Sequence, residues 1–229
     1  MVNAICQSIN FDAPGIEKRY WGRVVGLALE KLNPKGLETP ERRVSGHHLP
    51  SLCKETRQTL SLQEVKPLGF RNALILGLGV GTVAHLLAQR FPGARIDGVE
   101  LDPVIIEVAK EFFNLEKIPN LNVICADAFD LVTSHTKYEI RDTRYDLILS
   151  DLYCGGRFPE KFSQPEFLHG VRDLLAPDGL AIFNRVIRQG HREELDDFIE
   201  KIRSIFVRVE EVEVPGPSGF SNLLITARG

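Results

Sequence analysis

The chain has 229 residues, with 28 Lys and Arg against 31 Asp and Glu, which gives a formal net charge of -3. This length allows one large domain, or one domain with a short appendage, and a hydrophobic content of 43% is enough for a core. The mild acidic balance excludes a broadly basic nucleic-acid-binding protein, so we expect no nucleic acid among its partners.

The cysteines and the chain's hydropathy indicate where the protein works. The cysteines lie far apart and form no C-x-x-C pair, which predicts reduced thiols and no metal site; they are Cys6, Cys53, Cys125 and Cys154. No run of about 18 apolar residues predicts a membrane-spanning helix. The first residues lack the basic and apolar segments of a signal peptide. We expect a cytoplasmic protein without a membrane partner.

The chain divides near residue 66. Before it, residues 16–32 predict an amphipathic helix that ends at Asn33-Pro34-Lys35-Gly36. Its apolar face would hold Ile16, Tyr20, Val24, Leu27 and Leu32. We interpret residues 1–65 as an N-terminal extension or cap, partly helical, and residues 66–229 as the main domain.

After residue 66, strands and helices alternate. Strands are predicted at 72–76, 94–99, 121–125, 145–149 and from 180, with helices at 81–90, 103–113, 164–175 and 191–205. This order predicts an α/β fold with parallel strands and helices on both faces. Two final strands, 207–214 and 223–227, are joined by a Pro/Gly turn that is too short for a parallel crossover. We therefore predict a seven-stranded, mostly parallel sheet with an antiparallel last strand.

Ligands of such sheets bind beyond the carboxyl ends of the strands. The first predicted strand ends in a glycine-rich turn before a helix, where the backbone can approach a ligand closely; its glycines are Gly77, Gly79 and Gly81. The second strand ends in Glu100-Leu101-Asp102. Glu100 is predicted to accept both hydroxyls of a ribose, with Leu101 beside it, whereas Asp102 before Pro103 fits a helix start.

The third strand distinguishes between two nucleoside ligands. It ends in Asp127-Ala128-Phe129, where a carboxylate can accept from an adenine amino group and Ala128 and Phe129 can pack beside the ring. A dinucleotide site requires a third glycine where this chain has Thr82. The pattern favours S-adenosylmethionine, or its decarboxylated form, over a dinucleotide.

The fourth strand ends in Ser150-Asp151-Leu152-Tyr153-Cys154. Asp151 is the candidate catalytic residue, because a carboxylate there can hold or deprotonate an amine so that its lone pair attacks the carbon on the sulfonium. Tyr153 can stack on the acceptor or form a hydrogen bond with it. The alternative for Asp151 is a capping role in a glycine turn.

These segments resemble the spermidine synthases and spermidine synthase-like proteins of the class I S-adenosylmethionine-dependent methyltransferase superfamily. ALILGLGVGTVAHLL is similar to the family's nucleotide loop, GVELDPVIIEVAKEFF to its ribose segment, ADAFD to its adenine segment and YDLILSD to the strand before its active site. FSQPEFLHGVRDLLAPDGLAIFN and PSGF are similar to its later segments. The resemblance implies a Rossmann-like fold, an S-adenosylmethionine-type cofactor without a metal, and a homodimer.

Two positions depart from the family's pattern. Its aminopropyltransferases usually carry an Asp in the glycine loop, where this chain has Val80, and a second carboxylate in the catalytic loop, where it has Cys154. A polyamine is multiply cationic, so losing both carboxylates removes much of its attraction to the site.

Three functions therefore stay open. The favoured one is methyl transfer to a small-molecule acceptor, an amine. The alternative is aminopropyl transfer from decarboxylated S-adenosylmethionine to a polyamine. The third is a nucleoside-binding protein that does not catalyse.

Overall fold

A computed structural model describes residues 20–32, 71–118, 120–134, 140, 143–188, 192–216 and 219–229. The remainder of the predicted N-terminal extension, with Ile16, Cys6 and Cys53, lies outside the described residues, as do positions 217 and 218 of the PSGF turn.

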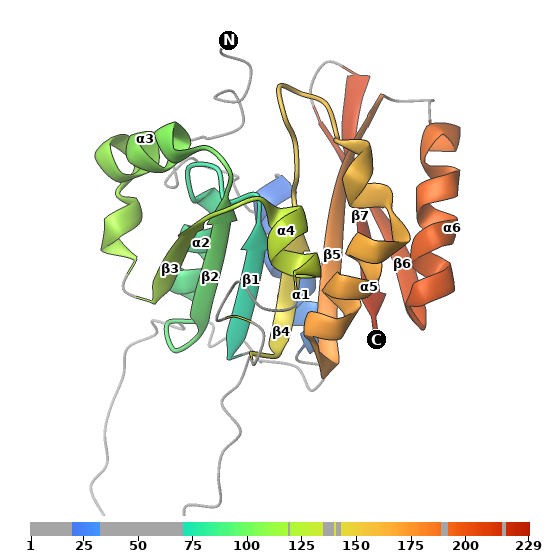
Figure 1. Ribbon diagram of the computed structural model, residues 1–229, viewed down its shortest axis with the longest axis horizontal. Coiled ribbons are helices and arrows are strands. Elements are labelled where there is room, and N and C mark those ends of the chain that lie inside the picture. Colours follow the sequence, from blue (N-terminus) through green and yellow to red (C-terminus); the bar gives the residue numbers. More distant parts are fainter. Residues whose placement is uncertain are drawn as a thin grey trace, which may run out of the picture.

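Among the described residues, seven strands form one sheet in the order β3-β2-β1-β4-β5-β7-β6 (Figure 1). The strands are β1 (Asn72–Leu76), β2 (Arg95–Glu100), β3 (Leu121–Cys125), β4 (Tyr145–Ser150), β5 (Leu175–Arg188), β6 (Arg208–Pro215) and β7 (Phe220–Arg228). β1 pairs parallel with β2 and β4, and β7 pairs antiparallel with β5 and β6. The predicted α/β fold with a mostly parallel sheet and an antiparallel last strand is confirmed.

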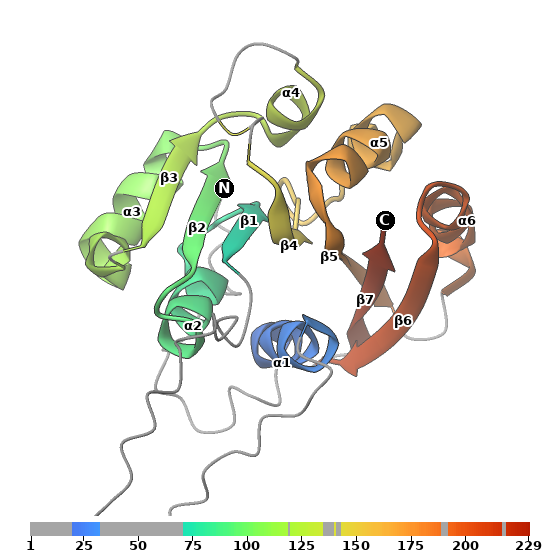
Figure 2. The same ribbon diagram turned by 90° about the horizontal axis from the view of Figure 1, so that it is seen from below.

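Helices cover both faces of the sheet (Figure 2). One face carries α1 (Tyr20–Leu32), α2 (Thr82–Arg90) and α3 (Pro103–Phe113), and the other carries α4 (Ala128–Thr133), α5 (Pro165–Leu174) and α6 (Asp196–Ile205). Short 3-10 turns lie at Leu115–Lys117, Glu160–Ser163 and Arg192–Leu195. The helix predicted over 191–205 thus starts as a 3-10 turn before α6.

The helix predicted over 16–32 is α1, and its apolar face packs on the sheet. Tyr20, Val24 and Leu27 are buried in one cluster with apolar residues of β1, β4 and β5, and Leu32 is partly buried beside them. α1 therefore covers the sheet next to α2 (Figure 2).

β5 begins earlier than predicted. Leu175 already pairs with Tyr145, and a register shift between Tyr145 and Leu147 takes the Ala176–Gly179 segment into the strand. The carboxyl half of β5 matters more for the site, because its last residues extend beyond the end of β4 and pair only with β7.

The hydrophobic core on the other face of the sheet, under α4, α5 and α6, is rich in aromatic rings. Phe183 of β5 makes edge contacts with Phe198 and Phe206 at ring-centre distances of 6.1 and 5.8 Å.

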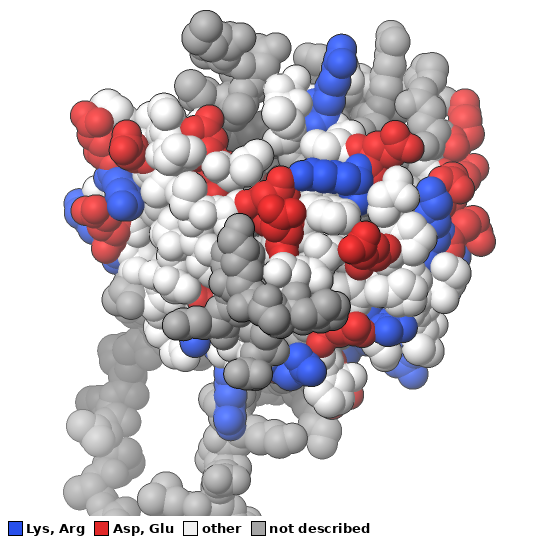
Figure 3. Space-filling model, in the orientation of Figure 1, with Lys and Arg blue, Asp and Glu red and all other residues white. Residues whose placement is uncertain are grey.

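On the face shown in Figure 3, acidic and basic side chains of the described residues are interspersed. Among the described residues, no helix is long and apolar enough to cross a bilayer.

Candidate functional site

The strand order reverses between β1 and β4, and ligands of open α/β sheets bind beyond the carboxyl ends of the strands at such a point. The glycine loop after β1 lies directly against the end of β4. A Cβ on Gly77, whose φ is 89°, would come within 2.3 Å of the Asp151 carbonyl oxygen. A Cβ on Gly79 would meet no atom within 4 Å, so the loop leaves open space at this position.

Glu100 is anchored at the end of β2. Its carboxylate accepts from the backbone amide of Gly79 at 2.8 Å, and from those of Leu101 and Asp102 at 2.9 and 3.1 Å. The contact with Gly79 joins the two predicted cofactor segments. Asp102 caps α3 through the amide of Val104 at 2.8 Å, as its place before Pro103 indicates. Leu101 is 60% exposed beside them.

Asp127 lies at the end of β3 and has partners of its own. One carboxylate oxygen accepts from the amide of Phe129 at 2.8 Å and caps α4, a helix that the sequence analysis missed. The other pairs with Lys161 at 2.5 Å. Burial alone would raise the pKa of Asp127, but the bonds from Lys161 and the Phe129 amide hold it below its ordinary value. Ala128 is buried in the core.

Asp151 follows β4 and receives neutral donors. The Asn184 side chain donates to its carboxylate at 2.7 Å and accepts in turn from Asn222 at 3.0 Å. Burial raises the pKa of Asp151, and Asn184 and Tyr20 oppose that rise. The Tyr20 hydroxyl, buried on α1, is close enough to Asp151 to affect its pKa but has no well-formed hydrogen bond of its own.

Tyr153 lies beside Asp151 and reaches β5. Its hydroxyl oxygen accepts from the amide of Val186 at 2.5 Å. Burial raises the pKa of this hydroxyl to about 12, with the Val186 amide and Arg185 opposing the rise and Asp151 adding to it. Asp151 and Tyr153 are therefore brought together, as the loop sequence predicts.

Sequence reasoning missed four residues of this region. Lys161 and Arg185 belong to segments without a recognised motif, and Tyr20 was assigned only to an apolar helix face. Asn184 carried a readable signal, because it follows the apolar end of the GLAIF segment as Asp151 follows that of β4.

The two departures from the family pattern differ in their surroundings. Val80 is 6% exposed and packs in the apolar cluster under α1 and α2. Cys154 is an exposed free thiol whose backbone pairs with that of Arg157. Neither position supplies a carboxylate. Among the described residues, no group of three or more His, Cys, Asp and Glu side chains could hold a metal.

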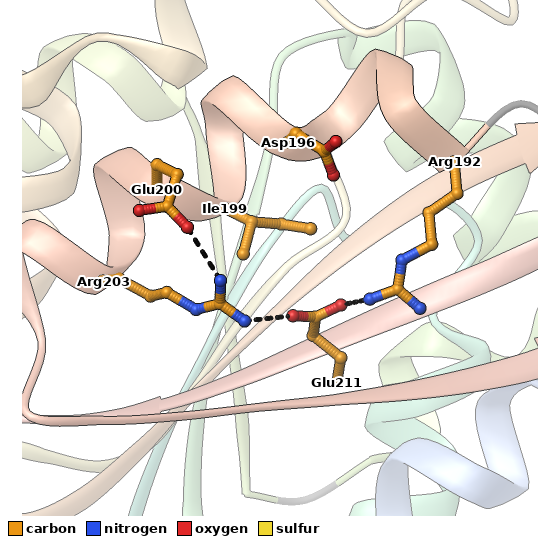
Figure 4. Close-up of a pocket in the computed structure, with 6 residues that line it drawn as sticks. All are labelled: Arg192, Asp196, Ile199, Glu200, Arg203 and Glu211. Atoms are coloured by element: carbon orange, nitrogen blue, oxygen red, sulfur yellow. Dashed lines mark hydrogen bonds and ion pairs between the residues drawn. The ribbon is translucent and has the colours of Figure 1, made fainter.

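A separate hollow lies between α6 and β6, at the edge of the sheet (Figure 4). Glu211 pairs there with Arg203 at 2.7 Å and also with Arg192, while Arg203 pairs with Glu200 at 2.7 Å. The lining residues are Arg192, Asp196, Ile199, Glu200, Arg203 and Glu211. Arg192, Arg203, Glu200 and Glu211 pair with one another, and no predicted site residue takes part. We assign these ion pairs to the joining of α6 to β6.

Part of the chain is similar to proteins of known family. The family model described as a methyltransferase domain matches residues 73–179. A polyamine aminopropyltransferase of Vibrio vulnificus is 30% identical over 146 residues, covering 64% of this chain and 47% of that protein. An eEF1A lysine and N-terminal methyltransferase homolog of Drosophila melanogaster is 31% identical over 124 residues, covering 52% of this chain and 18% of that protein. The chain thus spans half or less of the length of these relatives.

Solved structures share the fold. Human Methyltransferase-like protein 13 in complex with SAH superposes with a TM-score of 0.59 at 24% identity, covering 69% of this chain and 71% of that one. A probable spermidine synthase from Corynebacterium glutamicum superposes with a TM-score of 0.58 at 24% identity, covering 69% of this chain and 56% of that one. The strand order and the glycine loop agree with the methyltransferase-domain match over residues 73–179, and the chain is similar to polyamine aminopropyltransferases and to methyltransferases.

Proposed function

We propose that the chain binds S-adenosylmethionine and transfers its methyl group to the amino group of a small-molecule acceptor. The observation that carries the proposal is Asp151, a partly buried carboxylate that neutral donors hold and that no cation among the described residues neutralises. A carboxylate in this state can accept a proton from an attacking amine.

The residues present fit the nucleoside part of the cofactor. The open space above Gly79 leaves room for a ligand against the backbone, and Glu100 is fixed beside it. Asp127 is assigned to the adenine amino group. Its ion pair with Lys161, which is 43% exposed, does not bar this role, because exposed pairs contribute only about 0–1 kcal/mol. A complex with SAH is known for the human neighbour.

Bound S-adenosylmethionine supplies an electrophilic methyl carbon on a positively charged sulfur. Methyl transfer to the acceptor amine would leave the electron pair of the broken C–S bond on the sulfur. Asp151 takes the proton that the nitrogen loses, and the hydrogen bond from Asn184 fixes the orientation of its carboxylate.

Aminopropyl transfer is the second candidate, and the Vibrio vulnificus relative supports it. Against it stand the apolar surroundings of Val80 and the thiol of Cys154 where a polyamine site usually has carboxylates. A polycation would find one carboxylate, Asp151, where the family pattern supplies three.

Calorimetric titration with S-adenosylmethionine, its decarboxylated form and methylthioadenosine tests the proposal. We expect the carboxylated donor to bind more tightly than the decarboxylated one, and Asp151→Asn to lower methyl transfer by about 10²-fold or more while leaving donor affinity within about twofold. Preference for the decarboxylated donor would establish the aminopropyl alternative instead. Binding without turnover on any amine would indicate a non-catalytic protein.

A further inference from the structure

Arg185 is a cation near the candidate site that has no anionic partner among the described residues. It follows Asn184 on the part of β5 that extends beyond β4. Its guanidinium carbon lies 3.7 Å from the ring centre of Phe158 and 4.7 Å from that of Phe198. Its Nε is buried without a hydrogen-bond partner, and none of the ion pairs of the described residues includes Arg185.

This arrangement is costly without a ligand. A partly buried cation without a carboxylate loses hydration that aromatic contacts repay only in part. The ring centres of Phe158 and Phe198 lie 5.8 Å from each other, so the two rings cannot both lie over flat faces of the guanidinium. The Tyr153 hydroxyl interacts with the guanidinium, while the Nε–H group has no hydrogen-bond partner among the described residues. A planar fork of N–H donors matches a carboxylate better than any other common small-molecule group, because both can bond in pairs.

Arg185 is placed to act together with Asp151. Successive side chains of a strand point to opposite faces, so Asn184, which donates to the Asp151 carboxylate, does not itself bring Arg185 to it. The Tyr153 hydroxyl, two residues after Asp151, interacts with both charges. A cation and an anion therefore flank Tyr153 at the end of the sheet where the acceptor is expected.

We propose that Arg185 binds a carboxylate of the acceptor, so that the acceptor is an amino acid or a similar compound with both an amine and a carboxylate. This inference rests on the proposed function and names its substrate class. Asp151 receives the amine and Arg185 the carboxylate, and the two charges of the acceptor are matched by opposite charges of the site. A polyamine would instead bring a second cation toward Arg185.

The test compares two ligands that differ by one carboxylate, L-ornithine and 1,4-diaminobutane. Each is titrated by calorimetry into the full chain saturated with S-adenosylhomocysteine. We expect ornithine to bind at least about tenfold more tightly, since its carboxylate would accept charge-assisted hydrogen bonds from the guanidinium. Arg185→Leu should abolish this preference and Arg185→Lys, which keeps the charge without the fork, should retain part of it. Arg172→Leu removes an exposed cation paired with its neighbour Asp173 and should leave the preference unchanged.

The outcomes separate the two proposals. Equal affinity for the two ligands, no binding of either, or a preference that survives in Arg185→Leu overturns the role of Arg185. If Arg185→Leu weakens binding of S-adenosylmethionine but not of its decarboxylated form, the carboxylate is the donor's, and the acceptor assignment is wrong. Ornithine preference without methyl transfer refutes only the proposed function. If Arg185→Leu does not bind S-adenosylhomocysteine, the preference for ornithine over 1,4-diaminobutane in Arg185→Lys decides the role of Arg185 alone.

Discussion

At the carboxyl end of β4, burial works against the charge that the proposed chemistry requires of Asp151. Burial raises its pKa, although Asn184 and Tyr20 oppose the rise. A base is active only when deprotonated, so methyl transfer should fall as the pH drops through this raised pKa, at a higher pH than an ordinary carboxylate gives. The pH profile of kcat at saturating donor and acceptor measures this fall. If kcat falls only at a pH within or below the usual pKa range of carboxylates, the assignment of Asp151 is contradicted.

The same pKa shift predicts a gain in stability on removing the charge. A carboxylate whose pKa is raised by folding stabilises the protein below its unfolded-state pKa, and this contribution is lost as the pH rises through the folded-state pKa. Asp151→Asn should therefore raise the Tm at pH 7 by roughly 2–4 °C for each kcal/mol recovered, and the difference from the wild type should shrink toward pH 4. A Tm of Asp151→Asn below that of the wild type at pH 7 would count against this account.

Glu100 and Asp102 form a matched pair at the end of β2, because both carboxylates accept from backbone amides but only Glu100 reaches the glycine loop. Glu100→Ala should weaken S-adenosylmethionine and methylthioadenosine alike by about tenfold or more, since the ribose is common to both. Asp102→Ala should cost about 1 kcal/mol of helix capping with little change in affinity. Calorimetry on both variants tests the ribose role, which unchanged affinity in Glu100→Ala would exclude.

At the scale of elements, α1 belongs to the core that surrounds the site. Leu27 is 1% exposed against the sheet, whereas Glu30 of the same helix faces solvent. Leu27→Ala should lower the free energy of unfolding by about 2–5 kcal/mol, and Glu30→Ala should change it by less than about 0.5 kcal/mol. Urea unfolding should give one transition that shifts as a whole. If α1 were only an appendage, the main transition would stay in place in Leu27→Ala.

The elements with a strong local pattern could be predicted, and those set by contacts distant in sequence could not. The strand at Leu121–Cys125 has the predicted bounds because an apolar run ends there in turn residues. The helix α4 has six residues, too few for a helical period, and its capping residue Asp127 was interpreted only as a ligand group. The early start of β5 depends on its pairing with Tyr145, which no local pattern reveals.

Over the whole molecule, the predicted alternation of strands and helices was sufficient to expect the site at one edge of the sheet, since parallel strands present their carboxyl ends together. The contributions of Tyr20 and Arg185 were not predictable. Tyr20 reaches Asp151 only because α1 packs across the sheet. Arg185 is notable only because Phe158 and Phe198 lie beside it and no carboxylate of the described residues does. Both depend on which side chains meet in space.

The glycine loop after β1 lies against the carboxyl end of β4, and this approach gives the last prediction. Gly77 and Gly79 both have positive φ, but a Cβ on Gly77 would strike the Asp151 carbonyl oxygen, whereas one on Gly79 would enter open space. Both changes to Ala should cost about 1–2 kcal/mol for the left-handed backbone. Gly77→Ala should cost more in stability, because the loop must also move away from β4. Gly79→Ala should show the larger loss of S-adenosylhomocysteine affinity per kcal/mol of stability lost, since its methyl group occupies the space assigned to the ligand. Urea unfolding and calorimetry on the same two variants separate these effects. An equal ratio of affinity loss to stability loss in the two variants would mean that the ligand does not lie over Gly79.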